Sequence, residues 1–171
     1  MSNLEVFFAE HRRLRACNAE MAAFARQLAG PATEILNDAR WRFTRTLLRT
    51  LTMKDRLVFP RLRLHPDPTA RETADRFATS TVADYERFAN HTRRFPPEMA
   101  STDWRSYAAA VRMRTAEMDE RMTREETELF PLLADAPEVD AGRNLTDINW
   151  AADGWRVREL LGIDKGGAEA A

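Results

Sequence analysis

Four stretches of this chain carry apolar side chains at steps of three and four residues, the spacing of one buried face of an α-helix. They cover residues 3–29, 33–57, 69–95 and 101–132. At about 1.5 Å rise per residue, each helix would be roughly 40 Å long, with one side to bury along its whole length. We therefore predict an all-α fold, an up-down-up-down four-helix bundle. The first stripe consists of Leu4, Phe7, His11, Leu14, Asn18, Met21, Ala25 and Leu28.

Glycine and proline divide these stretches from one another. Gly30 and Pro31 separate the first two, and Thr33 is the predicted N-cap of the second helix. Pro60 lacks a backbone donor and must kink or end that helix. The third helix is closed by Pro96 and its neighbouring proline, so the fourth begins near residue 101 or 102.

Composition excludes several classes of function. The 26 basic and 27 acidic residues give a formal charge of -1, which disfavours nucleic-acid binding. No apolar run reaches the roughly 20 residues of a membrane span. The single cysteine, Cys17, and an N-terminus without a secretory pattern predict a cytoplasmic protein. We find no phosphate-binding loop or catalytic triad pattern, so we expect no enzymatic activity.

The domain prediction is a bundle over residues 1–135 and an extension over residues 136–171. The extension contains one short amphipathic segment, 153–161, preceded by Trp150 and containing Trp155. These tryptophans would cap the bundle or form a homodimer patch. Residues 165–171 are small and polar enough to be disordered.

Arginines are frequent on the second predicted helix. We interpret them as a solvated face balanced by acids elsewhere on the bundle, in preference to a surface for an acidic partner. They are Arg40, Arg42, Arg45 and Arg49.

The second and fourth helices end alike. "DRLVFPRL" closes the second and "ETELFPLL" closes the fourth, with Pro60 and Pro131 71 positions apart. This repetition predicts two related helix pairs stacked antiparallel.

With these endings and the segment "AEHRRLR" at residues 9–15, the chain resembles the hemerythrin family of HHE cation-binding domains over about residues 4–133. The resemblance implies a pair of irons held between the helices. In the family, the second and fourth helices each carry a histidine and, one turn later, a carboxylate, both pointing inward. The first and third helices supply further histidines.

Carried onto this chain, the resemblance retains two ligands and loses three. His11 and Glu125 stand at ligand positions, whereas Arg121 replaces the fourth-helix histidine. Thr50 and Lys54 replace the second-helix histidine and carboxylate. Arginine and protonated lysine have no lone pair for a metal and would repel it. We therefore predict that no normal di-iron centre forms.

The replacements also predict that a cation neutralises the charge of Glu125, because Glu125 would otherwise be an isolated carboxylate in an apolar interior. We expect it to lie within hydrogen-bonding distance of Lys54 or Arg121. A second interpretation keeps a metal, with His11, His91 and Glu125 or Glu126 holding a single iron or zinc.

The functional expectation is a non-enzymatic binding or regulatory protein with an unidentified protein or small-molecule partner. No cofactor is expected in this interpretation, although iron is possible. The alternative is a metal-binding protein with a reduced histidine and glutamate site, which the resemblance connects with sensing of oxygen, nitric oxide or iron.

Overall fold

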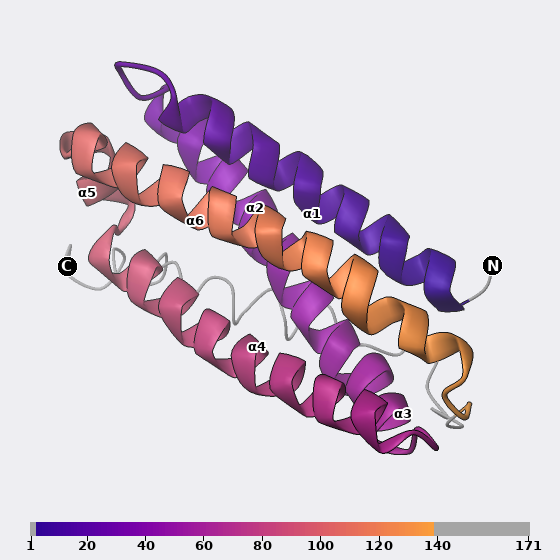
Figure 1. The fold of residues 1–171 in the computed structure, drawn as a ribbon. Coiled ribbons are helices and arrows are strands. Elements are labelled where there is room, and N and C mark those ends of the chain that lie inside the picture. The colour runs from indigo at the N-terminus through magenta and orange to yellow at the C-terminus, as the bar shows by residue number, and fades with distance from the viewer. Residues whose placement is uncertain (1–2, 139–171) are drawn as a thin grey trace, which may run out of the picture.

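The computed structural model describes residues 3–138, and within that range the chain forms helices and no strand (Figure 1). Two of the helical elements, η1 and η2, are π-helical turns, and η3 is a 3₁₀ helix. The elements are α1 (Asn3–Ala25), α2 (Thr33–Met53), η1 (Lys54–Val58), α3 (Phe59–Arg63), α4 (Pro68–Arg94), α5 (Pro97–Thr102), α6 (Trp104–Arg124), η2 (Glu125–Leu129) and η3 (Phe130–Ala134).

The long helices α1, α2, α4 and α6 run in alternating directions, which confirms the predicted bundle (Figure 1). α1 packs along both α2 and α6, whereas α4 meets its neighbours mainly through α3 and η2. An aromatic cluster that includes Phe7, Phe59 and Phe130 fills one end of the bundle. A second cluster, with Leu36 and Tyr107, fills the other end. Among the described residues, no helix is long and apolar enough to cross a membrane.

The connection between α1 and α2 differs from the prediction. α1 ends at Ala25, earlier than expected, so Leu28 lies outside the helix and is fully exposed. Thr33 is not the N-cap either, because Ala32 occupies that position and no side chain caps the helix. Gly30 in this connection packs closely on Trp104, and a Cβ on this glycine would lie 2.8 Å from the indole ring.

The fourth helix also begins differently. The residues expected to start it belong to α5, a separate short helix, and α6 begins after Asp103. The Asp103 carboxylate accepts a hydrogen bond from the backbone N–H of Ser106, which satisfies one of the free donors at the start of α6.

The two phenylalanine-proline endings produce the same irregularity. Before each proline the helix widens into a π turn, in which Phe59 N–H donates to the Lys54 carbonyl and Phe130 N–H donates to the Glu125 carbonyl, five residues back. A proline ring clashes with the carbonyl four residues before it, and widening the helix relieves that clash. The predicted kink at Pro60 is therefore a π turn that lets the helix continue into α3.

The predicted arginine face is wrong at one position. Arg45 is exposed, but Arg40 is only 5% exposed and lies inside the bundle. The helical spacing places Arg40 on the inward side, four residues after Leu36 and three before Phe43, but a charged residue is normally assigned to solvent. The predicted C-terminal segment with Trp150 and Trp155 lies outside the described residues.

Candidate functional site

A buried carboxylate is the centre of the candidate site. Glu125 opens η2 and is 1% exposed, and Lys54 opens η1 and is 3% exposed. Lys54 Nζ lies 2.6 Å from Glu125 Oε1, a distance typical of a charge-assisted hydrogen bond. The two π turns thus place one cation and one anion opposite each other in the bundle interior.

Arg121 makes the second contact to the same carboxylate oxygen. It lies one turn before Glu125 on α6, and its Nε donates to Oε1 at 2.7 Å. The far end of its guanidinium reaches α4, where Nη2 donates to Thr81 Oγ1 at 2.5 Å and Nη1 pairs with the Asp84 carboxylate. Arg121 therefore joins the buried carboxylate to the helix that otherwise packs least closely on the bundle. Both predicted partners of Glu125 are confirmed.

His11 contacts the site from α1. Its ring is 1% exposed, and Nδ1 lies 3.0 Å from Glu126 Oε1, with which it shares a hydrogen bond. Nε2 lies 3.1 Å from Glu125 Oε2, and neither of these two atoms forms a hydrogen bond within residues 3–138. Arg15 Nη2 donates to the other Glu126 oxygen at 3.0 Å. The adjacent carboxylates of η2 are thus contacted from α1 as well as from η1 and α6.

The electrostatic balance keeps Glu125 ionised. Burial alone would raise the pKa of its carboxyl, but the charge and hydrogen bond of Lys54, together with the nearby His11 ring, outweigh burial. The pKa of Glu125 is therefore below its usual value. The ionised form is the one that the surrounding cations need as a partner.

The donor set does not fit a pair of irons. One Glu125 oxygen is bonded to two cations, and each cation would lie next to any metal that this carboxylate bound. The Thr50 hydroxyl donates to the Thr46 carbonyl on its own helix and so does not contact the Glu125 carboxylate. Within residues 3–138, no three histidine, cysteine, aspartate or glutamate side chains are grouped as a metal site would require.

His91 does not join His11 and Glu125, contrary to the single-metal interpretation. It lies beyond Asp84 on α4, where its ring stacks on Tyr107 at 5.8 Å and contacts Phe95 at 5.2 Å. Burial, followed by the nearby charges of Arg40, Arg114 and Arg94, lowers its pKa from 6.5 to about 4. His91 is therefore a neutral aromatic neighbour of the second core cluster at neutral pH.

Two acids of the interior were not identified from the sequence. Asp84 follows Phe77 by seven residues and Thr81 by three, so the helical spacing already placed it on the inward side of α4. Glu10 is 2% exposed and pairs with Arg13 and, at 2.9 Å, with Arg49. Its position next to His11 and three residues after Phe7 was the available signal.

Comparison with known families agrees with the all-α bundle fold. Residues 2–133 match the family described as "Hemerythrin HHE cation binding domain". No curated protein and no solved structure matches the chain at a significant level. The match covers α1 to η2 and most of η3, and so includes every residue of the Glu125 site.

Proposed function

Because the chain belongs to the hemerythrin HHE cation-binding family, we propose that it is a bundle protein in which an ion-pair cluster replaces the di-iron centre. Its role is then non-enzymatic, either binding a partner or regulating one. The observation that carries the proposal is the pair of cations on Glu125, with Lys54 Nζ at 2.6 Å and Arg121 Nε at 2.7 Å from one oxygen.

A metal ion would compete with Lys54 and Arg121 for the lone pairs of the Glu125 carboxylate. A metal would have to displace two charge-assisted hydrogen bonds from Glu125 and would leave two cations buried beside it. Lys54 could assist only after losing its proton, and a deprotonated arginine is not accessible in a protein. The cluster neutralises Glu125 without a metal, which supports a stabilising role for this site.

Elemental analysis of the protein, purified from cells grown with added iron, tests the proposal. We expect well under one iron per chain and no visible absorption from an oxo-bridged pair. A matched variant restores the family ligands with Thr50→His, Lys54→Glu and Arg121→His, and it should take up more iron under the same conditions.

A stoichiometric di-iron centre in the unaltered protein would refute the proposal. A single bound ion between His11 and Glu125 would also refute it and would favour the metal-sensing alternative. Failure of the restored variant to take up iron, with its helical content unchanged, would contradict the assignment of residues 50, 54 and 121 to ligand positions.

A further inference from the structure

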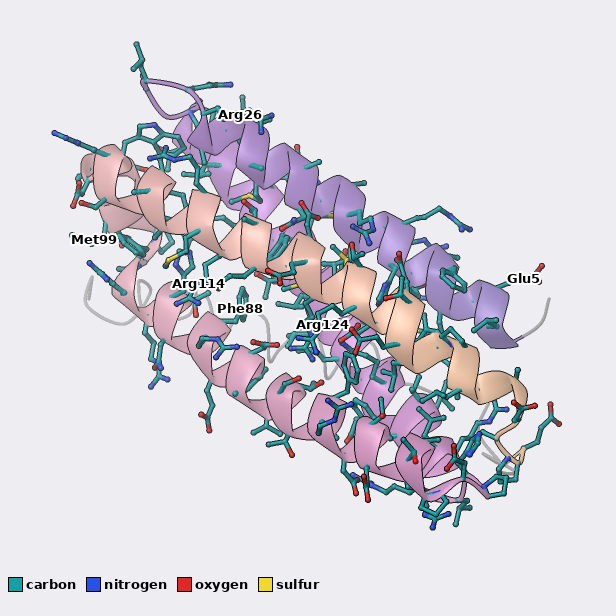
Figure 2. The ribbon with its side chains drawn as sticks, viewed as in Figure 1. Glu5, Arg26, Phe88, Met99, Arg114 and Arg124 are labelled. Atoms are coloured by element: carbon teal, nitrogen blue, oxygen red, sulfur yellow. The ribbon has the colours of Figure 1, made fainter. Side chains whose placement is uncertain are left out.

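A cavity of about 420 Å³ lies between α2, α4 and α6. Most of its wall is apolar, and Phe43, Phe88 and Met118 contribute to it. Figure 2 shows Phe88 and Arg114 in the space between α4 and α6, and both residues line the cavity. Arg121 forms the boundary with the Glu125 cluster. The volume lies within the range of pockets that hold small organic ligands.

Arg40 lines this cavity and has an unused hydrogen-bond donor. The residue is 5% exposed, and its Nη2 donates to the Phe95 carbonyl at 2.5 Å. Its Nη1 is buried and has no hydrogen-bond partner within residues 3–138. The guanidinium carbon lies 5.5 Å from the centre of the Tyr107 ring, which offers a cation-π contact but no negative charge.

No carboxylate among residues 3–138 forms an ion pair with Arg40. Glu98 and Tyr107 act on it only at longer range, and burial lowers its pKa more strongly than they raise it. An arginine stays protonated in proteins, so the cation is held in the interior without a paired anion. A buried charge in this state is costly, and an anionic ligand would remove much of the cost.

We propose that this cavity binds a small amphipathic carboxylate, whose head pairs with the guanidinium of Arg40 and whose apolar body lies between α4 and α6. A single guanidinium matches a singly charged head better than a phosphate dianion, which requires more donors. The other arginines that line the cavity already pair with carboxylates: Arg87, Arg114, Arg121 and Arg124. The inference deepens the binding role proposed above by naming a ligand class. It uses a site other than the Glu125 cluster, so iron analysis and ligand titration can fail independently.

Isothermal titration of the full chain at pH 7 with decanoate, and separately with 1-decanol, tests the inference. The two probes share an apolar chain, but only decanoate carries the anionic head. We expect decanoate to bind and decanol to bind at least tenfold more weakly, a difference of about 1.4 kcal/mol. Equal affinities, or no binding of decanoate, would overturn the proposal.

Variants then locate the site. Arg40→Gln should weaken decanoate binding at least tenfold and leave decanol binding nearly unchanged. Arg45→Gln is the matched control, since Arg45 is exposed on the same helix and should have no effect. Equal loss in both variants, or none in Arg40→Gln, would overturn the role of Arg40.

A second variant keeps the test decisive if Arg40→Gln does not fold. Met118 is half-buried and lines the cavity, so Met118→Trp should fill part of the space and abolish binding of both probes. Circular dichroism and a thermal melt confirm that the variant is folded. Decanoate binding that survives in folded Met118→Trp would show that the probe binds elsewhere and would overturn the proposal.

Discussion

Replacing Lys54 with methionine is the most direct test of the buried cluster. Methionine keeps the length of an unbranched side chain and removes the charge, so the change separates electrostatics from packing. Lys54 is 3% exposed and Glu125 is 1% exposed, so water cannot easily take the place of the missing ammonium group. The variant leaves Glu125 with Arg121 on the same oxygen and with His11 beside the other.

The expected cost follows from these contacts. Removing one partner of a buried ion pair costs roughly 3–5 kcal/mol. Because Arg121 remains at 2.7 Å from Glu125 Oε1, the loss should be near the lower limit, about 3 kcal/mol. Adding Glu125→Gln removes the stranded charge, so the double variant should be at least about 1 kcal/mol more stable than the sum of the two single changes predicts.

Urea unfolding at pH 7, followed by circular dichroism, measures these differences. With a slope of about 2 kcal/mol per molar urea, a loss of 3 kcal/mol lowers the midpoint by about 1.5 M. Arg56→Met is the matched control, since Arg56 lies in the same π turn but is exposed, and it should change little. A loss below about 0.5 kcal/mol for Lys54→Met, or strict additivity in the double variant, would refute the reasoning.

Two further predictions concern other parts of the bundle. The pKa of His91 is about 4 in the folded chain and 6.5 as a free side chain. Between pH 6.5 and pH 4 the unfolded chain therefore binds a proton at His91 that the folded chain does not bind. The free energy of unfolding should therefore be highest above pH 6.5 and fall by up to about 3 kcal/mol towards pH 4. In His91→Gln the urea midpoint should change less with pH, and an unchanged pH dependence would contradict the prediction. Gly30→Ala places a Cβ 2.8 Å from the Trp104 ring, so thermal melts should show a loss of about 1 kcal/mol, and a gain in stability would mean that the ring moves aside freely.

The sequence predicted the centre of the candidate site because helical spacing determines which side chains point inward. His11, Lys54 and Glu125 each occupy a position on an apolar stripe, and the structure buries all three. The same rule places Asp84 on the inward side of α4, seven residues after Phe77 and three after Thr81. Spacing identifies positions well, and errors arise when residue type is allowed to override it.

Arg40 is a second case of that error. It lies four residues after Leu36 and three before Phe43, so the spacing places it on the inward side of α2, whereas its charge assigned it to solvent. The cavity that Arg40 lines leaves no such local signal, because the distance between the helices of a bundle is set by tertiary packing. The close packing of Gly30 on Trp104 is similar, because the two residues lie far apart in the sequence.

The two π turns explain why Lys54 and Glu125 meet in the bundle interior. Each turn precedes a proline, and each begins with a side chain directed into the bundle, Lys54 in one half and Glu125 in the other. Two carboxylates at these positions, as the family resemblance implies, would repel each other and would need a divalent cation between them. A cation in one half and an anion in the other attract directly at 2.6 Å. With lysine at position 54, the two π turns hold opposite charges that neutralise each other without a metal, and Arg121 adds a second cation to Glu125. This arrangement supports the proposed replacement of the di-iron centre.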